Sequence, residues 1–576
     1  MFLTALMAVG IVPSRTNAQV TLGEYAARRA ALAARIDSGV VVAFGGVGPV
    51  SFWPTFYQLP AFYYLTGFGE TDAALVMVKR NGIVSATMFV PTRTAMQERW
   101  VGARTRVADL EAKTGIAGRE IAQLGTSIDS LAASGLPFYV VPDVQTADYA
   151  AEDSLTRGAR FLSRVRLAHP WLVMHSVDST VGRLRAKKSA AEVALLRKAA
   201  QISVRGHQEA MKATAPGCGE NEIQALLEGT FRRFGGDRPG YGSIVGSGPN
   251  ATVLHYMEDS RIMHEGELLL IDAATSFEHY SADVTRTLPV NGRFSPAQRD
   301  IYQIVRDAQE AFVRQIKPGV GYGIANDSGK AVVTKGLLRL GLIQAIDATI
   351  DPPAGMQCPP TGCFQSQLYA VHGFGGHGIG LEVHDPAQYY EGSHEFRAGD
   401  VFTVEPGIYV SPDLLRSLPD TPKNRAMLAK VRPAVEKYKG IGVRIEDDYA
   451  LTGAGLEWLS AGVPREIPEV EALMRQREPE LAGAGGAGGR EFDGLIYWIA
   501  RNSSSISRMN GWMPPMGWRC PRQAPRRSAW RAHLRVDSVI GSQTSTVSTA
   551  VHVRAPAHTR SRLIHAVLSS RRPSRS

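Results

Sequence analysis

Two aspartates placed along apolar strand sequences constrain the fold of this chain more than any other feature. Asp272 ends an apolar run, and Asp283 lies where polar residues occupy every second position. This period of two puts Ser281, Asp283 and Thr285 on one face of a strand, and a turn over 275–279 would fold both segments into a hairpin. Each aspartate alone fits a strand-end or turn residue. Two carboxylates brought together repel each other unless a proton or a cation lies between them, so the pair favours a metal site.

Three histidines, His372, His377 and His384, lie within 13 residues of a glycine-rich segment. Glycine lets the backbone approach a ligand closely. Imidazole can bind a divalent ion, donate to an oxyanion or carry protons. A single histidine is more simply a satisfied polar side chain, whereas three in this setting predict a functional site.

Two further acids follow strand patterns. Glu405 ends an apolar strand sequence, and the alternation over 442–448 places Arg444 and Glu446 on one face. The alternative for Arg444 and Glu446 is a surface ion pair of little energetic weight.

Together the candidates are four carboxylates and one imidazole. This oxygen-rich set suits Mn²⁺, or another first-row ion such as Co²⁺ or Zn²⁺. Two ions roughly 3.5 Å apart can share a water, lower its pKa and polarise a carbonyl, which is hydrolase chemistry. No Ser/His/Asp or Cys/His arrangement competes, and the glycine-rich stretches lack the phosphate-binding loop pattern. The carboxylates are those of Asp272, Asp283, Glu405 and Glu446, and the imidazole belongs to one of the three histidines.

The chain divides by pattern into two folded regions. Strand and helix patterns alternate through 19–178, which predicts a smaller mixed α/β domain. Within it, Asn81-Gly82 separates two strand patterns and predicts a hairpin. Over 179–475, helices that begin with capping boxes (Ser189 with Glu192, and Ser295 with Gln298) alternate with β-rich segments. This pattern predicts an α+β domain with helices packed on one face of an antiparallel sheet.

The two ends differ from these regions. Residues 1–18 resemble a signal peptide without its positive start, which predicts export to the periplasm or the medium; a cytoplasmic protein is expected if the segment is not a signal. No other stretch is apolar enough for a membrane span. Residues 476–576 form a glycine-rich linker and a basic, disordered tail. From Arg490 onward 15 Arg face three acids, so the net charge of +10 belongs to the tail and predicts no nucleic-acid partner for the folded body.

Four segments of 180–475 resemble metallopeptidase family M24, the pita-bread fold. They are Leu-Ile-Asp followed by Ser-Ala-Asp-Val-Thr-Arg-Thr, Gly-His-Gly-Ile-Gly-Leu-Glu-Val-His-Asp, Thr-Val-Glu-Pro-Gly, and Gly-Val-Arg-Ile-Glu-Asp-Asp. The resemblance implies that the ligands of two divalent ions are Asp272, Asp283, His377, Glu405 and Glu446. It also implies that Asp283 and Glu446 bridge the ions and that Glu405 doubles as proton carrier.

The same resemblance implies roles for three more residues. His255, in Val-Leu-His-Tyr, would line the substrate pocket, although a strand-end polar residue is the alternative. His384 would contact the scissile carbonyl or the tetrahedral intermediate, and Arg444 would support Glu446 or the substrate. His372 is less secure, because the family pattern His-Gly-x-x-His is lengthened here by one glycine.

The N-terminal region narrows the resemblance to aminopeptidase P and prolidase, through the segments 62–70 and 98–104. The resulting hypothesis is a Xaa-Pro aminopeptidase that uses a metal-bridging hydroxide on peptides with proline at the second position. It implies a homo-oligomer, a dimer or tetramer. The alternatives are a prolidase that cuts only Xaa-Pro dipeptides, a non-catalytic pita-bread binding protein, and a nucleic-acid binder acting through the tail.

Cys358 and Cys363 lie in an insertion-like loop, Cys-Pro-Pro-Thr-Gly-Cys, ahead of the histidines. A small disulfide loop is one interpretation. A second metal site lacks further ligands, and two free thiols are the remaining alternative.

Overall fold

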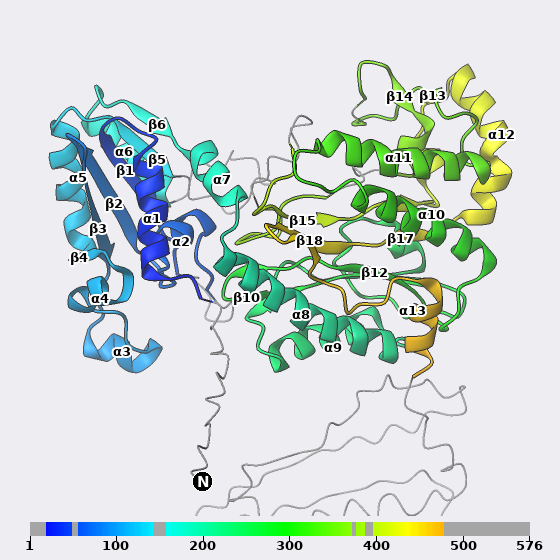
Figure 1. Cartoon of the computed structure of the whole chain (residues 1–576), viewed down its shortest axis with the longest axis horizontal. Coiled ribbons are helices and arrows are strands. Elements are labelled where there is room, and N and C mark those ends of the chain that lie inside the picture. Colours follow the sequence, from blue (N-terminus) through cyan, green and yellow to red (C-terminus); the bar gives the residue numbers. More distant parts are fainter. Residues whose placement is uncertain are drawn as a thin grey trace, which may run out of the picture. The chain divides into compact units, whose positions relative to one another are not determined.

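A six-stranded mixed sheet forms the centre of the N-terminal domain (Figure 1). The strand order is β4-β3-β2-β1-β5-β6, in which β2 is antiparallel to both β1 and β3 and the other neighbouring pairs are parallel. The turn at Asn81 and Gly82 has φ angles of 51° and 76°, as a tight hairpin requires, which confirms the predicted hairpin. The strands are β1 (Gly39–Phe44), β2 (Ala74–Arg80), β3 (Ile83–Val90), β4 (Ala117–Glu120), β5 (Phe138–Val141) and β6 (Met174–Ser176).

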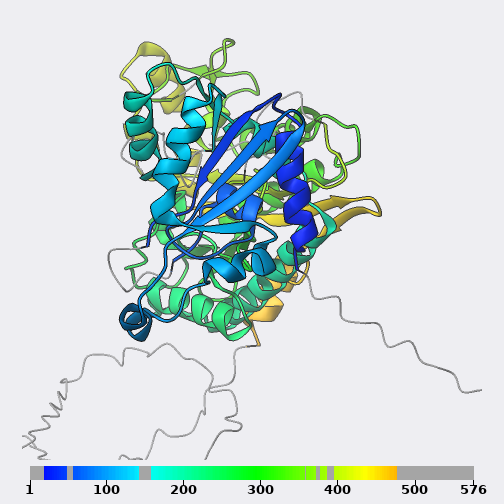
Figure 2. The same ribbon diagram turned by 90° about the vertical axis from the view of Figure 1, so that its left-hand side faces the viewer.

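Helices cover both faces of this sheet, because alternate residues of each strand are apolar on both sides. Val41 and Ala43 pack with α1 and α2, whereas Val40 and Val42 pack with α5 and α6 (Figure 2). The helices are α1 (Leu22–Ala33), α2 (Pro60–Thr66), α3 (Ala95–Val101), α4 (Leu110–Thr114), α5 (Leu124–Ala133), α6 (Arg157–Ala168) and α7 (Asp178–Ala186).

This computed structural model describes residues 19–48, 56–141, 157–356, 358–370, 376–385 and 395–476. The predicted signal segment, the linker with its basic tail, and His372 lie outside the described residues. Among the described helices, none combines the length and apolarity needed to cross a bilayer.

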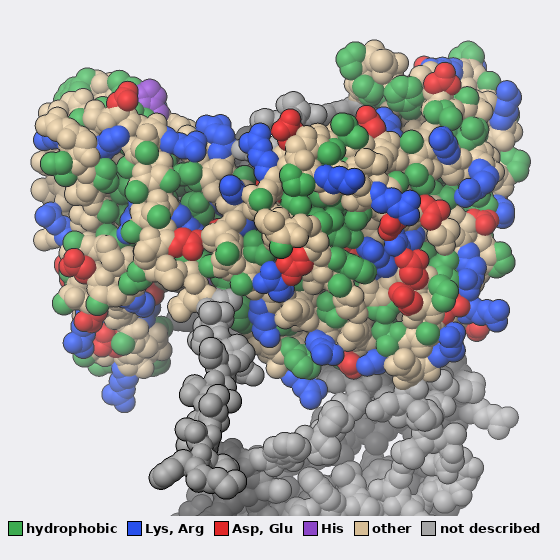
Figure 3. All heavy atoms as spheres, in the orientation of Figure 1, with side chains coloured by type: hydrophobic (Ala, Val, Ile, Leu, Met, Phe, Trp, Pro, Cys, Tyr) green, Lys and Arg blue, Asp and Glu red, His purple; other side chains and the backbone are tan. Residues whose placement is uncertain are grey.

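On the face in Figure 3, Lys and Arg side chains are interspersed with Asp and Glu.

The region 179–475, which the resemblance predicts to be catalytic and which is called the catalytic region below, has as its first element after α7 the long helix α8 (Ala190–Ala213). Both predicted capping boxes are confirmed: the Ser189 hydroxyl accepts from the Glu192 N–H, and the Ser295 hydroxyl accepts from the Gln298 N–H. The other helices are α9 (Glu220–Arg233), α10 (Pro296–Val313), α11 (Tyr322–Arg339), α12 (Pro422–Tyr438) and α13 (Ile467–Met474).

The strands of this region pair only antiparallel among the described residues, as predicted, but they form several short sheets rather than one. Acids and glycines interrupt the apolar runs, so that most strands end after two to five residues. The sheets are β12-β9-β8, β11-β10-β7, β15-β18-β19, β16-β17 and β13-β14. Their strands are β7 (Arg238–Pro239), β8 (Ile244–Ser247), β9 (Leu268–Asp272), β10 (Thr275–Phe277), β11 (Tyr280–Ser281), β12 (Thr285–Pro289), β13 (Thr349–Ile350), β14 (Cys363–Phe364), β15 (Val401–Val404), β16 (Gly407–Tyr409), β17 (Gly442–Arg444), β18 (Asp447–Thr452) and β19 (Gly455–Trp458).

The insertion before the histidines carries a disulfide. Cys358 and Cys363 are bonded, with their Cα atoms 4.9 Å apart. The disulfide interpretation is therefore confirmed, and the free-thiol alternative is wrong.

One hydrophobic cluster joins the N-terminal domain to the catalytic region. It includes Tyr25 and Leu65 from the first and Tyr280 from the second. Beside it, Arg28 of α1 lies 3.2 Å from the carboxylate of Glu192 in α8. The Tyr280 hydroxyl donates to the same carboxylate at 3.0 Å, so the start of α8 is tied both to α1 and to the strand that leads to Asp283.

Candidate active site

The β9–β12 hairpin brings Asp272 and Asp283 to one place. Asp272 is the last residue of β9 and pairs in register with Thr285, the first residue of β12. Within the hairpin, Glu278 and His279 have positive φ angles of 46° and 73° and make the turn, within the segment 275–279 where a turn was predicted. The Asp283 N–H donates to the Asp448 carboxylate at 3.2 Å, which fixes the backbone between the two strands.

His377 is held against the same hairpin. Its N–H donates to the Thr403 hydroxyl at 3.1 Å, and its ring Nδ1 lies 3.1 Å from the carbonyl of Gly378. With the proton on Nδ1, the Nε2 lone pair faces the acids, as a metal-binding imidazole requires. Nε2 is 3.4 Å from an oxygen of Asp283 and 3.5 Å from an oxygen of Glu405.

Glu446 completes a buried group with Asp283 and His377. One ligand-type atom from each of the three lies within 4.8 Å of the others. The Thr285 hydroxyl donates to one Glu446 oxygen at 2.6 Å. Among the described residues, the other Glu446 oxygen and one Asp283 oxygen are buried with no hydrogen-bond partner. Carboxylate oxygens left without partners near an imidazole nitrogen suit a divalent cation, so these residues fit the metal that their pattern predicts.

Asp272 differs, because it already has polar partners. The Tyr241 hydroxyl donates to it at 2.6 Å, and Arg444 donates to its other oxygen. Arg444 also donates to the Tyr409 hydroxyl at 2.7 Å and to the Thr285 hydroxyl at 3.2 Å. Arg444 therefore supports Asp272 directly and reaches Glu446 through Thr285.

The surface-pair alternative for Arg444 and Glu446 is wrong. Arg444 is 2% exposed and Glu446 is 1% exposed. Burial on this scale requires that each charge be compensated inside the protein.

The surroundings shift the pKa values of these acids in opposite directions. Burial, with the charges of Asp272 and Glu405, raises the pKa of Asp283 well above its ordinary value. Burial and the neighbouring Asp283 do the same to Glu446. Although burial alone would raise the pKa of Asp272, Arg444 and the Tyr241 hydroxyl lower it. Crowded acids of this kind ionise together only when a cation is bound among them.

The other predicted residues lie around this group. Glu405 follows β15 and accepts from the Thr403 hydroxyl at 3.2 Å. The His384 ring is 4.1 Å from the His377 ring, edge to face at 71°. His255 is exposed in the loop after a short 3₁₀ helix (Gly248–Thr252), close enough to Asp272 to interact with its charge. It is not at a strand end. The roles of these residues stay predictions.

Sequence reasoning missed the supporting side chains of Asp272 and Asp283. Tyr241 and Tyr409 hold Asp272 and Arg444, and Asp448 holds the backbone of Asp283. For Tyr241 the available signal is its place between two glycines, and for Asp448 it is the period of two that continues from Glu446. Tyr409 has no such signal.

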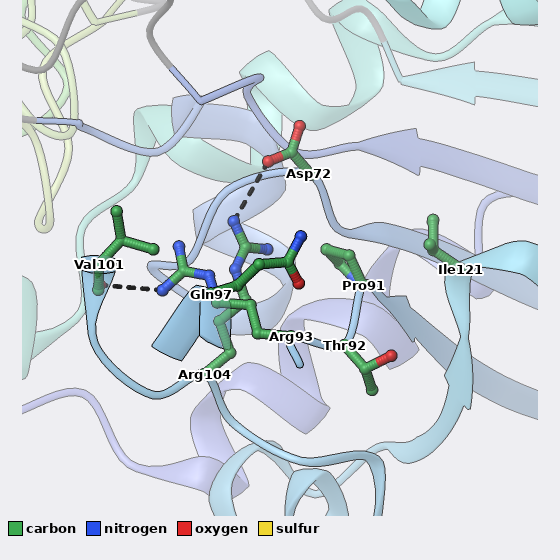
Figure 4. A pocket seen from close by; sticks show the side chains of 8 residues that line it. All are labelled: Asp72, Pro91, Thr92, Arg93, Gln97, Val101, Arg104 and Ile121. Atoms are coloured by element: carbon green, nitrogen blue, oxygen red, sulfur yellow. Dashed lines mark hydrogen bonds and ion pairs between the residues drawn. The ribbon is translucent and has the colours of Figure 1, made fainter. Parts of the chain in front are cut away.

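The N-terminal domain contains a separate cavity of about 410 Å³ (Figure 4). All of its lining residues come from 72–121, so it shares none with the buried acids. It is lined by Asp72, Pro91, Thr92, Arg93, Gln97, Val101, Arg104 and Ile121. Arg93 donates to the carbonyl of Val101 at 3.0 Å, and Arg104 lies 3.3 Å from Asp72.

Comparison with known proteins decides the family. The sequence profile of metallopeptidase family M24 matches residues 194–453, and that of the aminopeptidase P N-terminal domain matches residues 25–136. A Xaa-Pro aminopeptidase of Haemophilus influenzae is 35% identical over 423 residues, which cover 73% of this chain and 88% of the relative. The chain belongs to metallopeptidase family M24.

Other M24 proteins match over nearly their whole length. The Xaa-Pro aminopeptidase of Escherichia coli is 32% identical over 472 residues, covering 79% of this chain and 98% of the relative. Two solved structures of E. coli aminopeptidase P, a low-pH form and a Zn-substituted form with product, both have a TM-score of 0.66 and 29% identity. They cover 79% and 80% of this chain and 99% and 100% of their own. The chain is therefore a metal-dependent hydrolase with the pita-bread fold, as the resemblance implied.

Proposed function

We propose that this M24 peptidase is a Xaa-Pro aminopeptidase, which releases the first residue of peptides with proline second. The observation that carries this proposal is the buried convergence of Asp283, His377 and Glu446 with two unpartnered carboxylate oxygens. Its relatives in H. influenzae and E. coli carry the name of that activity.

Five side chains would hold two divalent ions: Asp272, Asp283, His377, Glu405 and Glu446. Carboxylates outnumber the imidazole, and this balance favours Mn²⁺ over Co²⁺ or Zn²⁺. When bound, such ions lower the pKa of a shared water and polarise the scissile carbonyl.

The chain's own residues complete the hydrolysis. Water oxygen bonds to the carbonyl carbon of the first residue, and the bond from that carbon to the proline nitrogen breaks. Glu405 takes a proton from the water and passes it to the leaving nitrogen. His384, beside His377, donates to the oxyanion as it develops. Arg444 keeps Asp272 ionised and oriented.

The proposed specificity for proline depends on two properties of the Xaa-Pro bond. A Xaa-Pro bond is a tertiary amide without an N–H, and the proline ring fixes φ. His255, exposed near Asp272, is placed to contact the bound peptide outside the buried acids.

The test is a peptide panel with titrated metals. Wild-type protein with Mn²⁺ should cleave Xaa-Pro-Yaa and leave Xaa-Ala-Yaa intact, while Glu446→Gln serves as the inactive control. Cleavage of Xaa-Pro dipeptides but not of tripeptides would make it a prolidase instead. A folded protein that turns over no Xaa-Pro peptide with any divalent ion contradicts the proposal.

We also propose that the protein acts outside the cytoplasm, which the Cys358–Cys363 disulfide supports. Fractionation of cells expressing the full chain should recover it in the periplasm or the medium. Recovery in the cytoplasm with free thiols contradicts this proposal.

A further inference from the structure

A cluster of four buried charges lies where the N-terminal domain joins the catalytic region. Arg185, near the end of α7, and Lys188, just before α8, face Glu382 and Asp385 of the segment 376–385. Lys188 Nζ is 2.9 Å from one Asp385 oxygen, and Arg185 Nη2 is 2.6 Å from Glu382 and also contacts the other Asp385 oxygen. The Lys188 and Asp385 side chains are 1% and 2% exposed. Two of the four side chains are cationic and two are acidic, and burial raises the pKa of Glu382 to about 7.

We infer that Lys188 and Arg185 are positioning residues for the hydrolysis, because they fix the segment on which His377 and His384 lie. This inference rests on the proposed function. A buried ion pair stabilises a fold little more than apolar side chains of similar volume would, whereas it requires one geometry. The cluster is therefore suited to setting the place of the histidine segment.

Because of contacts within the segment, the positions of the His377 and His384 rings depend on the position of Asp385. The Asp385 N–H donates to the carbonyl of Gly378 at 2.9 Å, and these two residues directly adjoin His384 and His377. A Cβ atom at Gly380 would lie 2.0 Å from an Asp385 oxygen and 3.1 Å from Lys188 Cε. The carboxylate and the lysine therefore press against the backbone between the two histidines.

The middle of the segment is tied to the aspartate hairpin. The Ser281 N–H donates to the carbonyl of Gly380 at 2.7 Å, two residues before Asp283. A displacement of Asp385 would therefore move His384 and His377 relative to the acids. Misplacement of reacting groups by about 1 Å can cost on the order of 100-fold in rate.

The two cations are themselves anchored through their backbone. The Tyr64 hydroxyl, from α2, donates to the carbonyl of Leu184 at 2.9 Å, and the Lys188 N–H donates to the carbonyl of Gly399 at 2.8 Å. Arg185 and Lys188 are thus anchored at the junction, and they in turn hold the histidine segment through Glu382 and Asp385.

The chain offers matched controls, because Lys187 and Arg183 are exposed neighbours of the two cations. With Xaa-Pro-Yaa and saturating Mn²⁺, Lys188→Met should lower kcat about 100-fold and leave KM within about twofold. Lys187→Met should stay within about twofold of wild type in both. Lys188→Arg should recover at least about tenfold of the loss, since it restores the charge. Arg185→Met against Arg183→Met should repeat the pattern.

Two further readouts separate positioning from a general loss of structure. In a His384→Ala background, Lys188→Met should lower kcat by at most about tenfold, because the part of its effect that acts through His384 is already lost and only the part through His377 remains. The visible absorption bands of bound Co²⁺ should shift in Lys188→Met and not in Lys187→Met. If Lys188→Met does not fold, Asp385→Asn, which keeps the shape of the side chain, is measured in its place.

The results that overturn the inference are distinct from those that overturn the proposed function. The positioning role is wrong if Lys188→Met and Lys187→Met have equal kcat, or if the effects of Lys188→Met and His384→Ala on kcat are fully additive. Wild-type protein without Xaa-Pro cleavage sinks the proposed function, whatever the variants do.

Discussion

Glu446 and Asp447 are neighbours in the chain, both buried, and they have opposite surroundings. Asp447 accepts from Arg286 at 2.6 Å, from the Ser460 hydroxyl at 2.6 Å and from Arg465 at 2.9 Å. Glu446 accepts only from Thr285 at one oxygen, among the described residues, and its other oxygen is unpartnered.

Their ionisation follows from these partners. Burial alone would raise the pKa of Asp447, but Arg286 and Arg465 lower it. Burial, Asp283 and Glu405 raise the pKa of Glu446. The comparison teaches that burial does not distinguish a structural acid from a reactive one. The distinction is whether the protein itself supplies the compensating charge or leaves it to a bound cation.

Removing the unpartnered acid should abolish the activity and leave the fold intact. We expect Glu446→Gln to lower kcat/KM at least about 1,000-fold, since it removes a group aimed at the reacting centre. Metal content should fall with it, while the unfolding temperature of the metal-free protein should not fall. A fully active Glu446→Gln protein with bound metal would contradict the comparison.

Removing the partnered acid should do the reverse. Asp447→Asn leaves the guanidinium of Arg286, which is 0% exposed, without its ionised partner. We expect a loss of about 3–5 kcal/mol in the free energy of unfolding, measured by urea denaturation with circular dichroism. Metal-free Glu446→Gln is the matched control, and equal stability of the two variants would show that the partners do not matter.

The two acids should also give the metal-free protein opposite pH responses. The raised pKa of Glu446 makes a contribution that is present below the ordinary carboxyl value of about 4 and is lost as pH rises toward the folded value. The lowered pKa of Asp447 makes a contribution that is present above the ordinary value and is lost as pH falls through the folded value. In the presence of a chelator, the free energy of unfolding of Glu446→Gln should therefore increase relative to that of the wild type as pH rises from about 4.

Thermal unfolding from pH 4 to 8, with chelator and with Mn²⁺, measures the Glu446 response, and comparison of wild type with Asp447→Asn below pH 4 measures the Asp447 response. The stabilisation by Mn²⁺ should grow with pH in the wild type and be smaller in Glu446→Gln. A wild-type response to Mn²⁺ that is flat across this range would argue against ionisable ligands.

The smallest effect should come from the support of Asp272. Tyr241→Phe removes the 2.6 Å hydrogen bond to this carboxylate. We expect metal affinity to fall about tenfold, within the range for residues that orient a ligand, and stability to change by about 1 kcal/mol. Calorimetric titration with Mn²⁺ measures the first. Tyr280→Phe, which removes a hydroxyl bonded to Glu192 instead, is the control and should leave metal affinity unchanged.

Local signals in the sequence predicted much of the fold. The hairpin at Asn81 and Gly82, the caps at Ser189 and Ser295, and the aspartate hairpin all depend on contacts a few residues apart. The division of the catalytic strands into several short sheets was not predicted, because it depends on where distant strands end and pair.

The candidate site was predicted through strand ends and motifs, which the structure brings together around Asp283, His377 and Glu446. The side chains that support the site were not predicted. The partners of Asp272 and Asp385 come from positions more than 30 residues away, and the periodicity of a strand or helix does not indicate contacts over such a separation.

The contact between Arg28 and Glu192 has a consequence for how this enzyme can be divided. Glu192 caps α8, accepts from Tyr280, and lies 3.2 Å from Arg28 of α1. A chain begun at residue 179 would leave that carboxylate without Arg28 and expose the apolar residues that Tyr25 and Leu65 cover. The catalytic region is thus not expected to be stable without the N-terminal domain. A domain exchanged from a relative must supply a cation at the position of Arg28.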